Sequence, residues 1–258
     1  MKLLLVNDDG IYAPGLAALK ASVTGYGQIQ VIAPHLERSG MSHAITVNRP
    51  LRLTEAEWGL IIDGTPADCV KMGIQGLKME PDFVLAGINR GANLGTDVLY
   101  SGTVSAAIEA VLLGVPAVAL SLCGSGEFMP TAEYYAKKLL FESPGILCNK
   151  GLIPKDGLLN INIPALPQEK IRGIRVTRLG VSRYEAVLEK RLDPRGGSYY
   201  WMGGRPLPSP KKEPDIDLVA VDQGYISITP LQFDLTYFAE IPELTKALQT
   251  DYSTEDGK

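Results

Sequence analysis

Two adjacent carboxylates are the residues of this sequence best suited to metal chemistry. Asp8 and Asp9 follow a short apolar run and precede Gly10. Neighbouring carboxylates repel each other unless a positive charge lies between them, and a hard divalent cation such as Mg²⁺ or Mn²⁺ prefers oxygen ligands of this kind. Asp-Asp-Gly is also an ordinary turn sequence. From these residues alone, a metal site and a turn are evenly matched interpretations.

Two later segments favour the metal site. The first contains Ser39, and the second is the glycine-rich segment 87–95, which contains Asn89 and Asn93. A serine hydroxyl and an asparagine carbonyl are neutral oxygen donors that complete the shell of a hard cation without adding charge. The glycines of the second segment let the backbone turn tightly and approach a ligand closely. Such a long loop is better explained as a binding loop than as a flexible surface loop.

A candidate phosphate site follows. Ser101, Gly102 and Thr103 immediately precede a helical pattern over residues 104–112. A helix N-terminus with free N–H groups, a glycine and flanking hydroxyls suits an anion. N-capping by Ser101 or Thr103 is the simpler interpretation and is compatible with this one. A metal site beside an anion site is what metal-assisted attack of water on a phosphate ester requires.

The pattern of elements predicts that these residues meet. Short apolar runs alternate with helical patterns, and the predicted strands lie at residues 3–6, 29–34, 60–62, 83–86 and 115–120. This alternation predicts an α/β fold with an open, mostly parallel sheet flanked by helices, and such sheets bind ligands at the carboxyl ends of their strands. Asp8, Ser39 and Asn89 each follow a predicted strand, so we expect them at one sheet edge.

The character of the chain changes beyond about residue 160. Residues 160–163, 174–177 and 225–229 alternate apolar and polar side chains, a pattern typical of half-exposed antiparallel strands. A short helix is expected over residues 243–248. We therefore expect a catalytic core over residues 1–165 and a β-rich C-terminal extension over residues 166–258, although one continuous structural unit is also compatible with the sequence.

Composition and charge narrow the function classes. The chain has 258 residues, of which 45% are hydrophobic, and a formal net charge of −4. A protein with this net charge has no overall positive electrostatic field that would attract the phosphate backbone of a nucleic acid, so no stable nucleic-acid partner is expected. Residues 170–195 are locally basic. A solvated strand face explains them best, and a surface for a phosphate-bearing substrate or an acidic subunit is the alternative.

Several motifs are absent. The sequence has no P-loop, no dinucleotide glycine fingerprint before a helix, and no G-x-S-x-G, and its two histidines are His35 and His43. His43 could donate to a phosphate, although a lone histidine is more often structural. The three cysteines form no C-x-x-C pair, no signal peptide is apparent and no apolar stretch reaches the roughly 20 residues of a membrane span, so a cytoplasmic location is expected.

The sequence closely resembles the SurE family of survival-protein nucleotidases. The resemblance rests on motifs in order along nearly the whole chain: Asn7-Asp8-Asp9-Gly10, Arg38-Ser39-Gly40, Gly64-Thr65-Pro66-Ala67-Asp68, Gly87-Ile88-Asn89-Arg90-Gly91, Asn93-Leu94-Gly95, Tyr100-Ser101-Gly102-Thr103-Val104, Asn160-Ile161-Asn162-Ile163-Pro164, Asp193-Pro194-Arg195-Gly196 and Gly224-Tyr225-Ile226-Ser227.

This resemblance implies a metal-dependent phosphomonoesterase that acts on nucleoside 5′- and 3′-monophosphates. It further implies a Rossmann-like core, a C-terminal extension that builds homodimers or homotetramers, and one Mg²⁺ or Mn²⁺ per subunit. The implied metal ligands are Asp8, Asp9, Ser39 and Asn89, and the implied phosphate contacts are Asn93, Ser101, Gly102 and Thr103.

The chemistry leaves alternatives open. Asp8 or Asp9 would orient or deprotonate a metal-activated water, or one of them would instead form an aspartyl-phosphate. A non-catalytic nucleotide-binding or sensing module would use the same fold, since a phosphate site does not establish turnover. A phosphatase for RNA ends or polyphosphate would use the same site with a longer substrate.

Overall fold

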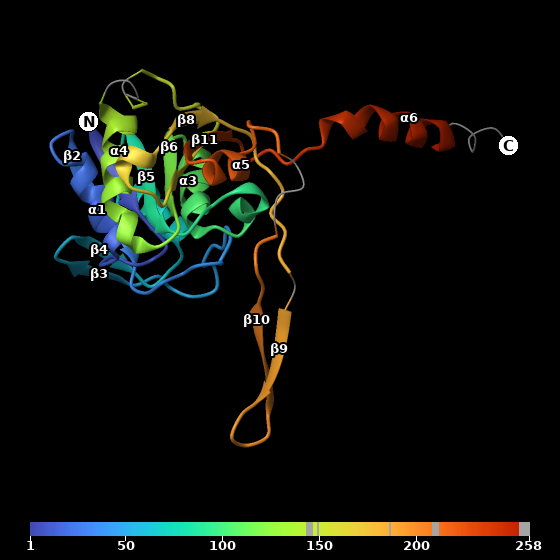
Figure 1. The fold of residues 1–258 in the computed structure, drawn as a ribbon, viewed down its shortest axis with the longest axis horizontal. Coiled ribbons are helices and arrows are strands. Elements are labelled where there is room, and N and C mark those ends of the chain that lie inside the picture. The colour runs from blue at the N-terminus through green and yellow to red at the C-terminus, as the bar shows by residue number, and fades with distance from the viewer. Residues whose placement is uncertain (143–146, 149, 186, 208–211, 253–258) are drawn as a thin grey trace.

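A nine-stranded sheet forms the centre of the molecule, with the strand order β3-β4-β2-β1-β5-β6-β7-β11-β8 (Figure 1). The computed structural model describes residues 1–142, 147–148, 150–185, 187–207 and 212–252. A separate antiparallel pair, β9 and β10, completes the strands. Their bounds are β1 Lys2–Val6, β2 Gln28–Pro34, β3 Leu53–Ala56, β4 Gly59–Ile62, β5 Phe83–Arg90, β6 Ala117–Cys123, β7 Leu158–Pro164, β8 Gly173–Val176, β9 Val187–Leu192, β10 Ser198–Gly203 and β11 Tyr225–Leu231.

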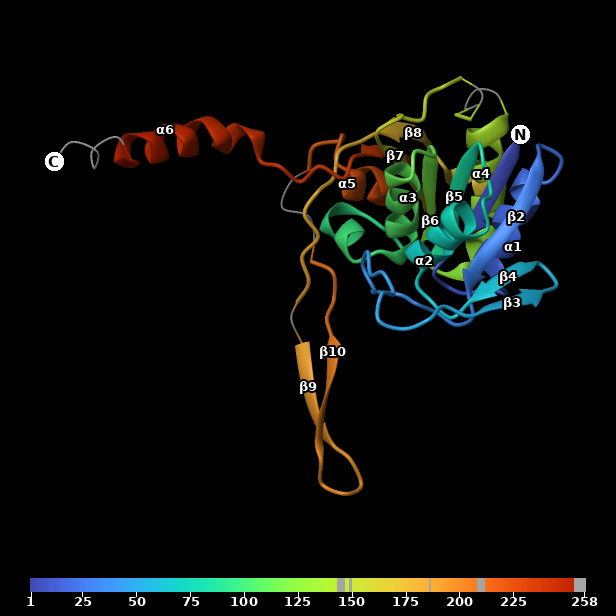
Figure 2. The ribbon, with the colours of Figure 1, turned by 180° about the vertical axis from the view of Figure 1, so that it is seen from behind.

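Helices cover both faces of this sheet. Helices α1 and α4 pack on one face and α2 and α3 on the other, as Figures 1 and 2 show from opposite sides. The bounds are α1 Pro14–Val23, α2 Pro66–Lys71, α3 Gly102–Leu112, α4 Met129–Phe141, α5 Asp217–Asp222 and α6 Ile241–Tyr252. Because both faces are covered, the central strands are apolar throughout, and residues 3–6 of β1 are completely buried.

The predicted fold class is confirmed. Strands β4, β2, β1, β5, β6 and β7 run parallel, and every strand predicted between residues 3 and 120 is present. The helix predicted after Pro66 begins with a capping box. Asp68 N donates to Thr65 Oγ1 at 3.1 Å, and Thr65 N donates to Asp68 Oδ2 at 2.9 Å, so two N–H groups that the helix cannot satisfy find acceptors.

The prediction of half-exposed antiparallel strands after residue 160 is wrong in part. Strand β7 is completely buried and pairs parallel with β6, and β11 pairs antiparallel with β7 but parallel with β8. The polar residues that produced the alternation in β7 and β11 are buried rather than exposed, whereas β8 is half-exposed as predicted. Asn160 and Asn162 donate to Asn93 O at 2.8 and 3.0 Å, so their polarity serves a hydrogen-bond network inside the protein.

Two extensions leave the body of the molecule. The β9–β10 hairpin and helix α6 project away from the sheet in different directions (Figure 1). Helix α6 is longer than the predicted helix over residues 243–248. Since β11 and β8 extend the same sheet as β1, residues 1–165 and 166–258 share one sheet. The division at residue 165 stays a prediction. In the described part of the chain, no helix is long and apolar enough to cross a membrane.

Candidate active site

A cavity of about 420 Å³ lies at the carboxyl ends of the parallel strands. Its lining includes five residues named from the sequence: Asp8, Ser39, Asn89, Asn93 and Ser101. Since β1 and β5 are neighbours in the sheet, the loops that follow them meet at one edge, as expected for a parallel sheet. The remaining lining residues are Gly40, Arg90, Ala92, Asp97, Tyr100 and Tyr184.

Asp8 is the central carboxylate of this cavity. It is only 3% exposed, and Thr103 Oγ1 donates to its Oδ1 at 2.5 Å. Burial raises the pKa of Asp8 to about 6, the charge of Asp9 adds to this effect, and the Thr103 hydrogen bond opposes it. Gly102 makes the close approach possible, because a Cβ there would lie 2.9 Å from the Asp8 side chain. Neither Gly102 nor Thr103, the predicted phosphate contacts, lines the cavity itself, and both lie against Asp8.

Asp9 does not line the cavity that contains Asp8. It lines a second cavity of about 380 Å³ together with Glu37, Arg90 and residues of α1 and α4. Its Oδ2 accepts a hydrogen bond from Arg90 N at 3.3 Å, and burial raises its pKa. Arg90 lines both cavities. The two adjacent carboxylates therefore line two neighbouring cavities that share Arg90.

Ser39 and Asn89 supply neutral oxygens at the cavity wall. Ser39 Oγ donates to Glu37 Oε1 at 2.8 Å, and Asn89 Nδ2 donates to Gly91 O at 3.0 Å. Within the part of the chain that the structure describes, Asn89 Oδ1 accepts no hydrogen bond, so this oxygen is available to a ligand. The Asp8 carboxylate accepts from Thr103 Oγ1 and is also stabilised by the backbone of Asp8 and Thr103.

Asn93 is held by a buried polar network. Its side chain donates to Ser121 Oγ at 2.8 Å, and its backbone N–H donates to Asn162 Oδ1 at 2.9 Å. Its carbonyl accepts from Asn160 and Asn162, as described above. The sequence does not predict that polar residues of β6 and β7 hold Asn93 in place. The signal was present in the polar residues that interrupt two otherwise apolar strands.

Helix α3 begins at the cavity. Ser101 is its N-cap, and Ser101 Oγ accepts from Val104 N at 3.0 Å. The first N–H groups of a helix have no partner within it, and the helix dipole adds a partial positive charge at this end. Ser101 thus caps the helix, and the same helix end lines the cavity.

The rim of the cavity contains residues that sequence analysis did not assign to the site. Tyr184 comes from the segment before the β9–β10 hairpin, and its hydroxyl donates to the Asp97 carboxylate. Burial, together with Asp97, raises the pKa of Tyr184 to about 12. Tyr184 is distant in sequence from every other lining residue, and no motif marked it. Tyr100 stands within the quoted motif and lines the same rim.

His43 does not line the cavity. Its Nε2 lies 2.9 Å from Glu109 Oε2 on α3, so its ring bonds to a protein carboxylate rather than facing a phosphate site. The structure thus gives His43 the structural role that the sequence analysis favoured for a lone histidine.

The donor set fits a hard divalent cation. Carboxylate, hydroxyl and amide oxygens come together around Asp8, and hard cations bind such oxygens. In the described residues, no cluster of three or more His, Cys, Asp or Glu side chains forms a conventional metal site. The neutral oxygens of Ser39 and Asn89, which line the same cavity, are further candidate ligands beside Asp8. The raised pKa of Asp8 also fits, since a buried charge is relieved by an opposite one.

The chain is similar to proteins of known name over nearly its full length. The family described as "Survival protein SurE" matches residues 3–186. The 5′-nucleotidase SurE of Moorella thermoacetica is 47% identical, with 96% of each chain covered. That of Carboxydothermus hydrogenoformans is also 47% identical, with 98% of this chain and 100% of the relative covered.

A solved structure agrees with these matches. The SurE protein from Aquifex aeolicus superposes with a TM-score of 0.82 at 38% identity, over 96% of this chain and 99% of that one. The family model, the full-length relatives and the solved structure all name SurE proteins. The chain belongs to the SurE family.

Proposed function

We propose that the chain is a divalent-metal-dependent phosphomonoesterase that hydrolyses nucleoside 5′-monophosphates, and also 3′-monophosphates, to nucleoside and phosphate. The relatives named 5′-nucleotidase SurE support an enzyme of the nucleotidase class. One observation of the structure carries the proposal: a buried carboxylate, Asp8, shares a cavity with neutral oxygen donors and with the N-terminus of a helix. This is the donor set that hydrolysis of a phosphate ester requires.

One Mg²⁺ or Mn²⁺ per subunit would be held by Asp8, Asp9, Ser39 and Asn89. When bound, such an ion polarises a phosphoryl oxygen and lowers the pKa of a coordinated water. Thr103 holds Asp8 in place through a hydrogen bond of 2.5 Å. Arg90 N contacts Asp9 in the same way at 3.3 Å. The chain thus orients both carboxylates before any ligand binds.

Groups of the protein itself bind the phosphate and accept a proton from the attacking water. The N-terminus of α3 and Asn93 hold the phosphate and the charge that develops on it. The Asn93 backbone is immobilised by Asn160 and Asn162, so this contact is preorganised. Asp8 or Asp9 accepts the proton of the attacking water.

The rim suits the organic part of a nucleotide. Tyr100 and Tyr184 are both more than half exposed and line the same cavity as Asp8. Exposed aromatic rings at the mouth of a polar cavity offer faces on which a base can stack, and stacking accepts every base. This supports nucleotides as a substrate class, without preference for one base.

A pair of substitutions tests the assignment of the carboxylates. Asp8→Asn and Asp9→Asn are expected to lower phosphate release from a nucleoside 5′-monophosphate by about 10²-fold or more at saturating Mg²⁺ and Mn²⁺, because each removes a charged oxygen ligand and a candidate base. Asp156→Asn, at an exposed position outside the site, is the matched control and should retain full activity. Wild-type turnover by either site variant would contradict the assignment. Isolation of a phosphorylated aspartate would favour the covalent route over a base.

The rival functions gain little support from the basic stretch 170–195. Arg178 pairs with Asp215, Arg191 pairs with Glu189, and Arg175 lies over the ring of Tyr225. These cations are therefore engaged locally, as on a solvated strand face. A cytoplasmic location and the absence of a stable nucleic-acid partner stay predictions.

A further inference from the structure

The segment that carries Ser39 has little structure of its own. Residues 35–52 join β2 to β3 and form neither helix nor strand. Ser39 itself is exposed, and among the described residues its hydroxyl donates a hydrogen bond to the neighbouring Glu37. Burial therefore does not fix its position. The place of Ser39 in the cavity depends on the contacts that anchor this segment to the rest of the protein.

The anchors lie on both sides of Ser39. Before it, Arg38 N donates to Asp8 O at 2.7 Å, which ties the segment to the end of β1. After it, Ser42 binds the turn that precedes α3, since its N–H donates to Tyr100 O at 3.1 Å and its Oγ to Leu99 O at 2.6 Å. Ala44 and Thr46 then bind the N-terminus of α2 through Thr65 and Asp68.

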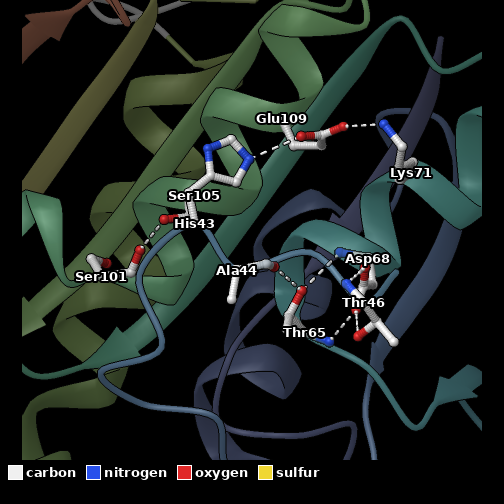
Figure 3. A network of polar contacts seen from close by, with 9 residues as sticks. All are labelled: His43, Ala44, Thr46, Thr65, Asp68, Lys71, Ser101, Ser105 and Glu109. Carbon is white, nitrogen blue, oxygen red and sulfur yellow. Dashed lines mark hydrogen bonds and ion pairs between the residues drawn. The ribbon is translucent and has the colours of Figure 1, made fainter. Parts of the chain in front are cut away.

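His43 provides the anchor to α3 itself. Its Nε2 contacts Glu109 Oε2 at 2.9 Å, and Lys71 Nζ on α2 contacts Glu109 Oε1 at 3.0 Å. Figure 3 shows the His43 and Lys71 side chains approaching the Glu109 carboxylate from two sides. Glu109 is only 5% exposed, and a buried carboxylate requires partners of this kind. The hydrogen bond from His43, followed by that from Lys71, lowers the pKa of Glu109.

The same helix carries the phosphate end of the site. Helix α3 begins at Gly102, beside Ser101, and Glu109 lies seven residues further along it. A contact between His43 and Glu109 therefore relates the Ser39 segment to the helix N-terminus through one rigid element. Lys71 contacts the same carboxylate but lies on α2, so its contact does not involve the Ser39 segment.

We infer that His43 is a positioning residue for the metal site: its bond to Glu109 holds the segment 35–52 on α3, so that the Ser39 hydroxyl faces Asp8 across the cavity. This inference rests on the proposed function, in which Ser39 and Asp8 share a divalent cation. His43 is not a catalytic residue, because its ring lies outside the cavity lining and its Nε2 is engaged by Glu109.

Metal binding without substrate tests this role directly. The full-length chain is titrated with Mn²⁺ by calorimetry as wild type, His43→Ala, His43→Gln and the control Lys71→Met. His43→Ala is expected to weaken Mn²⁺ binding by about tenfold to 100-fold, the range for groups that orient metal ligands. His43→Gln, whose amide can still donate to Glu109, should recover part of the loss. Lys71→Met should bind Mn²⁺ as the wild type does, although it removes a bond to the same carboxylate.

Kinetics separate positioning from a general loss of folding. For His43→Ala, the Mn²⁺ concentration for half-maximal phosphate release should rise by a similar factor, while kcat at saturating Mn²⁺ returns close to the wild-type value. Partial unfolding would instead lower the rate at every Mn²⁺ concentration. If His43→Ala does not fold, Mn²⁺ binding and the Mn²⁺ dependence of phosphate release are compared between His43→Gln and Lys71→Met instead. The inference then predicts weaker Mn²⁺ binding for His43→Gln than for Lys71→Met.

Three results would overturn the inference. The first is unchanged Mn²⁺ binding by the His43 variants, and the second is an equal loss in Lys71→Met, which would make the Glu109 pairs merely structural. The third is a wild type that binds no Mn²⁺, which overturns the proposed function and this inference with it. Wild-type binding combined with unaffected His43 variants overturns the inference alone.

Discussion

At the scale of the residue, Asp8 occupies a position that costs folding free energy. Its pKa is raised from 3.8 to about 6 by burial, so the folded protein binds a proton more tightly there than the unfolded chain does. The contribution of Asp8 to the free energy of unfolding of the metal-free protein therefore falls as the pH rises from about 4 to about 6. Below about pH 4 both states are protonated, and the cost disappears.

Asp8→Asn should for this reason stabilise the metal-free protein while it removes activity. At pH 7.5 in a chelator, the expected gain in the free energy of unfolding is about 1 to 3 kcal/mol, because the neutral amide carries no buried charge. At pH 4 the gain should vanish. Thermal unfolding of both proteins at the two pH values measures it. Equal or lower stability of Asp8→Asn at pH 7.5 would show that Asp8 is not destabilised by its surroundings.

The residues of the site differ in how readily the sequence reveals them. Asp8, Asn89, Ser39 and Asn93 lie at or beyond the carboxyl ends of strands and Ser101 caps a helix, and the sheet edge brings all five to one cavity. Asp9 faces the neighbouring cavity, which its position beside Asp8 did not indicate. Tyr184 was missed because its contact with Asp97 joins segments far apart in sequence, and only the folded chain brings these together.

At the scale of the element, Asp217 connects the C-terminal region to the cavity loop. It lies at the start of α5, is completely buried, and accepts hydrogen bonds from Gly95 N at 2.7 Å and Gly180 N at 2.8 Å. Gly95 follows Asn93 in the loop that lines the cavity. One carboxylate thus joins that loop to the segment leading into the β9–β10 hairpin.

Asp217→Asn should lower the free energy of unfolding by about 2 to 4 kcal/mol, because the amide turns an N–H group toward one of the backbone donors and leaves it without an acceptor. Urea unfolding provides the measurement. Asp222→Asn, an exposed position in the same helix, is the control and should change stability by less than about 0.5 kcal/mol. An equal and small effect of both substitutions would remove Asp217 from this role.

Strands with mostly apolar sequences were predicted well, whereas the burial of strands that also contain polar residues was not. Strands β1, β5 and β6 are apolar because both faces are covered, so their sequences indicate burial directly. Strand β7 alternates, but its asparagines point into a buried network rather than to solvent. A polar residue in a strand indicates either water or an internal partner, and sequence alone does not distinguish these.

At the scale of the whole molecule, the two extensions expose apolar side chains that the body does not cover. Met202 in β10 is 86% exposed, and Trp201, Leu188 and Leu192 of the same hairpin are exposed as well, as are Ile241, Leu244 and Leu248 of α6. Apolar surface gathered on projecting elements is typical of association sites. It agrees with the expectation, implied by the resemblance to the SurE family, that the C-terminal extension builds a homodimer or homotetramer, which stays a prediction.

The wild type should accordingly have a mass in solution of two or four chains of 27.8 kDa. The double substitution Trp201→Asp and Met202→Asp should shift it toward smaller species, because charges there oppose burial of the hairpin. Light scattering coupled to size-exclusion chromatography measures both. Leu152→Asp, at an exposed position outside both extensions, should not change the mass. A wild type that is monomeric at all concentrations would contradict the proposed assembly.

The central claim is that this cavity releases phosphate from a nucleotide with the help of a divalent cation. The most direct measurement follows phosphate release from a nucleoside 5′-monophosphate by the full-length chain, first in chelator and then after addition of Mg²⁺ or Mn²⁺. The account predicts no release in chelator and full recovery with the cation. Release that is indifferent to the chelator, or no release with either metal, would contradict it.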